Sequence, residues 1–188
     1  MSPVDQGGLF LLQFIAGMIV FILLLRFFLR ATYIDWRNPI VAFVAKVTNP
    51  ICMPFNKIIP SKGRWDGSAI AAAFVVQALF VLLLGYFTGK SYGISLIAIF
   101  SITEIMNQML DLMFWLIVIQ VILSWVGPNN NPNTQIFFQM AQPILAPFQR
   151  LVPPIGGMDL SPIFAIIVIK LTQIMVVGSI AQLGQSLV

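Results

Sequence analysis

The sequence predicts an all-α membrane protein with four transmembrane helices in two parallel repeats, and three observations support this class. Hydrophobic residues make up 59% of the 188 residues and charged residues only 9%, against about a quarter in soluble domains. Four apolar stretches are long enough to cross a bilayer. An offset of 93 residues superimposes the second half of the chain on the first, which predicts repeats over 1–90 and 91–188.

Each predicted span is a run of about 20 apolar residues, the length that a spanning helix requires. The first repeat contains spans at about 9–29 and 68–87, and the second contains spans at about 105–126 and 163–183. A further apolar run, 94–102, is too short to span alone. We expect it to form either an interfacial helix or an outward extension of the third span.

The two repeats share an unusual proline motif between their spans. The first copy reads NPICMPFNKIIP and the second reads QPILAPFQRLVP. The shared positions are Pro50, Pro54, Phe55, Lys57 and Pro60 in the first copy, and Pro143, Pro147, Phe148, Arg150 and Pro153 in the second. In a duplicated membrane protein, repeated irregular backbone is the first place to look for function.

The distribution of Lys and Arg predicts the orientation of the chain. Six cations fall within the loop 30–67, whereas the opposite ends of the spans offer only Lys90. This loop and the loop 127–162 are therefore expected in the cytoplasm, and both termini on the outer side of the membrane. The N-terminus lacks the positive region of a signal peptide, so the first apolar run is expected to be retained. The two repeats then have the same orientation, with their loops side by side and a pseudo-twofold axis along the membrane normal.

Each loop carries signals for an amphipathic helix that is interrupted by proline. Asn38-Pro39 and Asn131-Pro132 are typical helix starts, with an N-cap and proline at the first helical position. We expect a break and restart at Asn49-Pro50 and Gln142-Pro143, because proline interrupts a regular helix. Phe55 and Phe148 are expected to anchor at headgroup depth, and Lys57 and Arg150 to reach lipid phosphates.

Two interpretations of these loops remain open. Either the loops cap the bundle and bind lipid headgroups, or they form a docking surface or a re-entrant gate. Irregular backbone at membrane depth is tolerated only against protein or water, so the depth of the loops distinguishes the two.

An aspartate and a serine precede the second span of each repeat: Asp66 and Ser68, then Asp159 and Ser161. Such residues cap a helix and complement its positive end. A cation site built from both aspartates is the alternative.

Several polar residues fall inside the predicted spans. The third span begins with a stripe on one helical face formed by Glu104, Asn107, Gln108 and Asp111. Lys170 lies near the middle of the fourth span, and Arg26, about a turn inside the end of the first, is expected to snorkel. The stripe is either a packing surface with Lys170 paired or snorkelling, or a hydrophilic path or gate that uses Glu104, Asp111 and Lys170.

The composition argues against several classes of activity. The chain has no histidine and one cysteine, Cys52, which excludes an intrachain disulfide and a His/Cys metal cluster. No glycine-rich phosphate loop or paired nucleophile and base is present. We therefore predict no enzymatic activity and no cofactor, and the net charge of +4 reflects membrane topology rather than nucleic-acid binding.

The chain resembles the two-repeat bacterial form of the YggT (YlmG-like) membrane proteins. The matching segments are LLRFFLR at 24–30, NPIVAFVAKVTNPICMPFNKIIP at 38–60, SWV at 124–126, QPILAPFQRLVP at 142–153 and GGMDLSP at 156–162. The resemblance implies a bacterial inner membrane, which would place both termini in the periplasm, and a family without a settled biochemical activity. It also implies links to osmotic tolerance and potassium uptake in bacteria, a position beside cell-division genes in Gram-positive relatives, and cytochrome complex assembly and nucleoid distribution in plastids.

Two functions follow as hypotheses. The first is a membrane scaffold or assembly factor, linked to osmotic tolerance or envelope organisation, whose partners are membrane lipids and other membrane proteins or copies of itself. The second is a small oligomeric channel or transport protein for ions.

Overall fold

The computed structural model describes residues 3–34, 37–126, 131–152 and 159–185. The elements are α1 (Pro3–Ala31), α2 (Pro39–Asn56), α3 (Gly67–Thr88), α4 (Ile94–Val126), α5 (Pro132–Leu151), α6 (Ser161–Thr172), the π-helical turn η1 (Gln173–Val177) and α7 (Gly178–Gln185). Outside the helices, the described residues form a single isolated β-bridge, between Lys62 and Trp65.

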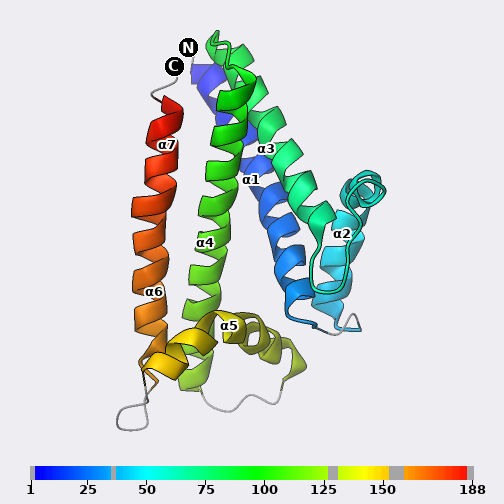
Figure 1. Ribbon diagram of the computed structural model, residues 1–188. Helices are drawn as coiled ribbons and strands as arrows, with labels where there is room; N and C mark the ends of the chain where they lie inside the picture. The colour runs from blue at the N-terminus through cyan, green and yellow to red at the C-terminus, as the bar shows by residue number, and fades with distance from the viewer. Residues whose placement is uncertain (1–2, 35–36, 127–130, 153–158, 186–188) are drawn as a thin grey trace.

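Within the part of the chain that the structure describes, four helices are long and apolar enough to span a membrane: α1, α3, α4 and the continuous stack of α6, η1 and α7. In Figure 1, α1 and α4 run in one direction and α3 and α6–α7 run in the other. The beginning of α1 and the end of α7 lie at the same end of the bundle, and α2 and α5 lie toward the opposite end. The predicted class, with two repeats in the same orientation, is confirmed.

The helix α4 lies at the centre of the arrangement. It packs against α3 and α1 from the first repeat and against α5, α6, η1 and α7 from the second. Among the described residues, α6 packs against α4 and α5, α7 packs against α4, and neither helix makes extensive contact with α1 or α3. The fourth span is therefore attached to the bundle along one side only.

Two apolar cores hold these helices together. The larger core joins α1, α2 and α3 to α4 and to the first half of α5, and Leu23 and Leu24 at its centre are fully buried. The smaller core lies within the second repeat, around Ile117 and Leu145. The first half of α5 thus packs on the first repeat and its second half on its own.

The apolar run 94–102 is the first part of α4, which confirms the outward extension rather than a separate interfacial helix. The expected break at Asn49-Pro50 and Gln142-Pro143 is wrong, because α2 continues to Asn56 and α5 to Leu151 with both prolines inside.

The position of the prolines explains why the helices continue. All four of them are exposed, so the lost hydrogen bonds fall on the outer side and the helix can bend toward the protein instead of ending. The ribbons of α2 and α5 change direction along their length in Figure 1.

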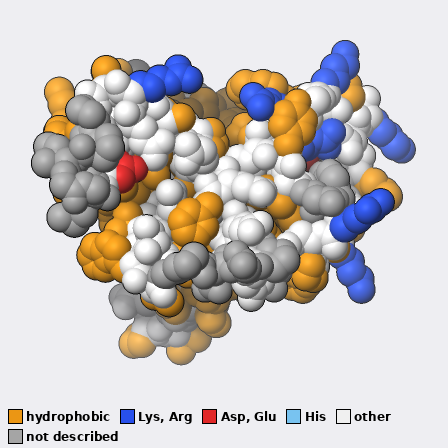
Figure 2. Space-filling model, turned by 90° about the horizontal axis from the view of Figure 1, so that it is seen from below, with side chains coloured by type: hydrophobic (Ala, Val, Ile, Leu, Met, Phe, Trp, Pro, Cys, Tyr) orange, Lys and Arg blue, Asp and Glu red, His pale blue; other side chains and the backbone are white. Residues whose placement is uncertain are grey.

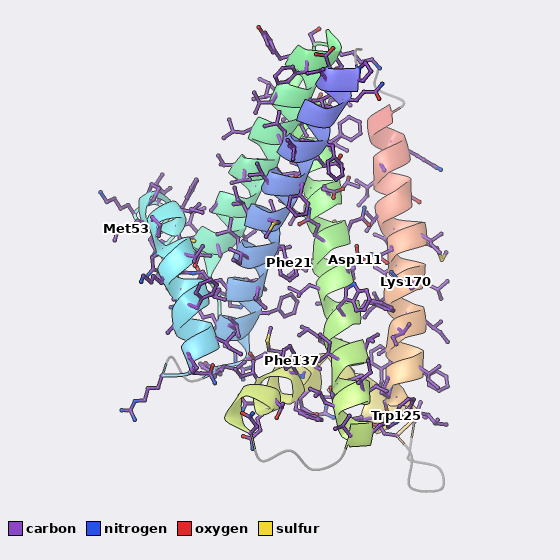
Figure 3. The ribbon with its side chains drawn as sticks, turned by 180° about the vertical axis from the view of Figure 1, so that it is seen from behind. Phe21, Met53, Asp111, Trp125, Phe137 and Lys170 are labelled. Carbon is purple, nitrogen blue, oxygen red and sulfur yellow. The ribbon has the colours of Figure 1, made fainter. Side chains whose placement is uncertain are left out.

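The two proline helices are placed differently. In Figures 1 and 3, α2 leans alongside α1 and α3, whereas α5 lies across the end of the bundle. The predicted start of α2 is confirmed, since Asn38 Oδ1 accepts a hydrogen bond from Ile40 N at 2.9 Å and Pro39 is the first residue of the helix. The same start therefore leads to two different docking positions.

Candidate functional site

A buried arginine joins three elements of the first repeat. Arg26, on α1, is 5% exposed. Its Nε donates to Asp66 Oδ2 at 2.9 Å, directly before α3. Its Nη1 donates to two residues of α2, Thr48 Oγ1 at 2.9 Å and Asn49 Oδ1 at 2.7 Å. We call this network, completed by the serines around Asp66, the Arg26 clamp. The expectation that Arg26 snorkels is wrong, because its partners lie inside the protein.

Asp66 is fully buried and fully hydrogen-bonded within the clamp. Its Oδ1 accepts from Ser68 Oγ at 2.6 Å, from Ser61 Oγ at 2.8 Å and from Ala69 N at 3.3 Å. Burial by itself raises the pKa of Asp66, but these hydrogen bonds and the charge of Arg26 outweigh it and lower the pKa below its usual value. Asp66 therefore stays ionised at neutral pH while it caps α3.

Cys52 lies on the inner side of α2, near the clamp, and is fully buried. Burial is the main cause of its raised pKa. A buried thiol with a raised pKa reacts slowly. Cys52 therefore reports on whether α2 is docked.

Among its described residues, the second repeat has no such clamp. The position equivalent to Arg26 is Ile119, and the position equivalent to Thr48 is Ala141. Asp159 is exposed and accepts from Ser161 N at 2.8 Å and Gln149 Nε2 at 2.9 Å. The structure places the two predicted capping aspartates in separate networks. Among the described residues, no group of three or more Asp, Glu, Cys or His side chains could hold a metal ion.

The repeated proline motif presents most of its members to the outside. Pro60, Lys57 and Arg150 are exposed, as are the four helical prolines. Phe55 and Phe148 are half-buried against the two cores, so only part of each ring is available to act as the predicted headgroup anchor. Pro153 lies outside the described residues.

The surface around α2 is both basic and apolar. Figure 2 shows the Lys and Arg side chains gathered mostly on one side of this end of the molecule. The exposed cations of the first loop are Arg37, Lys46, Lys57, Lys62 and Arg64, and the exposed apolar side chains include Phe43, Met53, Ile58 and Trp65. This combination is typical of helices at the boundary between membrane and water. We call this region the α2 surface.

A second polar cluster lies between α4 and α6. Lys170 Nζ is 3.4 Å from Asp111 Oδ1 and 2.7 Å from Gln173 Oε1. Gln173 Nε2 donates to the same Asp111 oxygen at 2.8 Å, and Lys170 Nζ lies 4.6 Å from the centre of the Phe114 ring. Figure 3 shows the labelled Asp111 and Lys170 approaching each other from the two helices. We call Asp111, Lys170 and Gln173 the midspan cluster.

The rest of the predicted stripe lies beside this cluster. Gln108 Nε2 donates to Glu104 Oε1 at 3.4 Å, and the backbone oxygen of Asn107 accepts from Gln173 Nε2 at 3.4 Å. Sequence reasoning missed Gln173, although its spacing of three residues from Lys170 places both on one helical face. Gln173 is also the first residue of η1, and π-helical turns often occur at functional sites.

Comparison with known proteins agrees with this organisation. The sequence model of the family described as CCB3/YggT matches residues 6–87 and again 99–180, with the spacing of the internal repeat. No solved structure matches the chain.

Two relatives cover most of the chain. An uncharacterized protein of Pseudomonas aeruginosa is 34% identical over 96% of this chain and 93% of its own. The uncharacterized protein YggT of Escherichia coli K12 is 30% identical over 85% of this chain and 84% of its own. Together with the double match and the four apolar helices, this similarity shows that the chain is a multi-pass membrane protein that belongs to the CCB3/YggT family.

Proposed function

We propose that this protein is a scaffold of the bacterial inner membrane that presents the α2 surface to lipid headgroups and to other membrane proteins. In this role it would support osmotic tolerance or envelope organisation without catalysing a reaction. The observation that carries the proposal is the Arg26 clamp, which ties α2 to α1 and to the start of α3.

The clamp supports a scaffold because it fixes the position of a surface. Burying an ion pair is costly, and such pairs are a weak source of stability by themselves. Arg26 uses its hydrogen bonds to hold one helix in one orientation, which is what a preorganised docking surface requires. The α2 surface then meets a partner without first being ordered.

The chemistry of the α2 surface fits the boundary of a membrane. Pro50 and Pro54 lack a backbone N–H. The backbone carbonyl oxygens of Lys46 and Pro50, four residues earlier, therefore lose their helical hydrogen bonds. These outward-facing oxygens need water or polar groups, which hydrocarbon cannot supply. Exposed lysines beside them complement anionic headgroups. The cytoplasmic side, which the charge distribution predicts, is where such headgroups are enriched.

The proposal can be tested with a photo-crosslinking residue in place of Met53 on the α2 surface, in native membranes. Leu79 on α3, which is also exposed and apolar, is the matched control position. We expect discrete protein adducts from position 53 and not from position 79. The double variant Arg26→Ile with Asp66→Asn, which leaves no unpaired buried charge, should reduce them severalfold. Adducts with lipid alone, or equal protein adducts from both positions, would contradict a docking role.

A channel or transport protein is the second candidate, and the midspan cluster favours it. The cluster opens to the side of the chain, since the side chains of Asp111 and Lys170 are 52% and 44% exposed. An ion path would therefore run between subunits. Asp111→Asn and Lys170→Met should then each alter potassium flux into proteoliposomes, and unchanged flux in both variants would remove this candidate.

A further inference from the structure

The midspan cluster lies at a depth where a bilayer offers no water. Asp111 is near the centre of α4, roughly 25 Å from Ile94 and from Val126 at 1.5 Å per residue. Lys170 is about 13 Å from the start of α6 at Ser161. Both positions fall inside a hydrocarbon layer about 30 Å thick. A charged pair at this depth must face protein or a wet cavity.

The single chain does not provide that cover. The two charged side chains are about half exposed, and the neighbouring Trp115 and Ile174 are exposed as well. Asp111 Oδ1 accepts two hydrogen bonds, but no described residue donates to Asp111 Oδ2. Lipid tails cannot supply a donor. This face of α4 and α6 is therefore incomplete in one copy.

The internal repeat shows that the position equivalent to Lys170 is a packing position. The position on α3 that corresponds to Lys170 is Gln77, which is 5% exposed. The helix α3 packs against α4, whereas α6 and α7 have no comparable contact with the first repeat. On the side of the fourth span, the second repeat thus exposes a position that the first repeat buries, whereas Met18, the counterpart of Asp111 on α1, is exposed but uncharged.

The charges on this face complement a second copy of the same face. The donors Lys170 and Gln173 lie directly beside the acceptor Asp111, so a twofold axis along the membrane normal would bring Lys170 of each copy to Asp111 of the other. The exposed side chains Met18 and Phe21 on α1 and Leu79 and Leu82 on α3, which lie near mid-depth, are apolar. They offer Asp111 no donor.

We infer that the protein forms a homodimer in the membrane, in which the α4 and α6–α7 faces of two copies meet and their midspan clusters pair across a twofold axis. The interface is separate from the α2 surface, so the dimer would leave α2 free on both copies. The Asp111–Lys170 pair of a single chain becomes a four-membered charge network that is closed off from lipid.

Disulfide cross-linking in native membranes tests this arrangement. In a full-length Cys52→Ala background, Ile174→Cys places a thiol beside the cluster, at a position that is 71% exposed. Leu79→Cys, on α3 and 54% exposed, is the control at similar depth. We expect oxidation to link two copies through position 174 and at least tenfold less through position 79. If neither Ile174→Cys nor Trp115→Cys cross-links above the control, the interface is wrong.

A charge-reversal experiment separates pairing between copies from pairing within one chain. A chain with Asp111→Lys carries two cations at the cluster, and a chain with Lys170→Asp carries two acids. Each variant alone should form at least tenfold less dimer than the natural sequence, since like charges would face each other across the twofold axis. Co-expression of the two variants, one with a distinguishing tag, should restore mixed dimers cross-linked through Ile174→Cys.

The mixed dimer is the decisive result, because neither variant can rebuild an ion pair within its own chain. Failure of the mixture to recover, while both variants insert at normal levels, would overturn the homodimer. In that case a different protein or a water-filled defect covers the cluster. Neither result bears on the cross-linking at Met53 that tests the scaffold.

Discussion

In the first repeat, Arg26 ties α1 to α2 and to the start of α3, whereas the equivalent position of the second repeat is Ile119 and Asp159 stays at the surface. In the second repeat, Asp111 and Lys170 pair near mid-depth, whereas the equivalent positions of the first repeat are Met18 and Gln77. Among the described residues, each repeat therefore carries one network that pairs a cation with a carboxylate, and the two networks lie at different depths.

This difference teaches that duplication preserved the backbone plan while the polar contacts diverged. The prolines, the helix starts and the spans recur in both copies because each copy must cross the membrane and return. The clamp holds α2 alongside the bundle, and α5, which lacks it, lies across the end of the bundle. The charged network of the first repeat is buried inside the chain, whereas that of the second repeat is exposed at the side of the chain.

The largest difference between the two repeats is expected when the stability of the Asp66→Asn variant is compared with that of the Asp159→Asn variant. The first change leaves Arg26 buried without its counter-charge, and we expect a loss of about 3–5 kcal/mol of unfolding free energy. The second removes an exposed contact and should cost less than about 1 kcal/mol. Reversible unfolding in detergent measures both values, and the rate of Cys52 modification reports whether α2 has moved.

Asp66→Asn should accelerate Cys52 modification, and Asp159→Asn should leave it unchanged. Equal losses of stability in the two variants would mean that the clamp is not what distinguishes the repeats.

The clamp can also be transferred to the second repeat. Ile119→Arg alone introduces a cation without a settled partner and should lower stability by about 2.5–3.5 kcal/mol, the value that insertion scales give for a charge within a span. Adding Ala141→Thr supplies the hydroxyl that Thr48 provides in the first repeat, and Asp159 is already present. We expect the second change to recover about 1 kcal/mol, measured by the same unfolding assay. No recovery would show that α5 cannot adopt the position of α2.

Lys170→Gln gives the second repeat the residue that the first repeat has at Gln77. In dilute detergent, where copies are separated, the change removes only half-exposed contacts. Polar contacts between membrane helices average about 0.6 kcal/mol, and we expect a loss of this size in thermal unfolding. A loss as large as that of Asp66→Asn would place the midspan cluster among the structural supports of the single chain.

The smallest expected effect concerns pH. Because folding lowers the pKa of Asp66, its contribution to stability is complete above the unfolded pKa and is lost as the pH falls through the folded pKa. The stability difference between the natural chain and Asp66→Asn should therefore stay constant from about pH 5 to 8 and shrink only below about pH 3.9. A difference that changes near neutral pH would mean that Asp66 is not held ionised.

Much of the fold was predictable, since the signals are local. Apolar runs of sufficient length predicted all four spans, and Asn38-Pro39 predicted the start of α2. The predicted break at Asn49-Pro50 was wrong. A helix bends at a proline instead of ending when the proline lies on its exposed side, and how the helix packs decides which side is exposed. Gln173 was missed because its spacing from Lys170 indicates a shared helical face but not which residue of another helix that face meets.

The sequence by itself determined the number of spans, the duplication and its spacing, the shared orientation of the repeats and the family, because hydrophobicity, periodicity and motif register are sums over neighbouring residues. Only the tertiary structure decided which charges meet. Arg26 and Asp66 are 40 residues apart, and Asp111 and Lys170 are 59 apart. Such pairs depend on how helices pack, and a charge inside a membrane takes whichever partner the packing brings within reach.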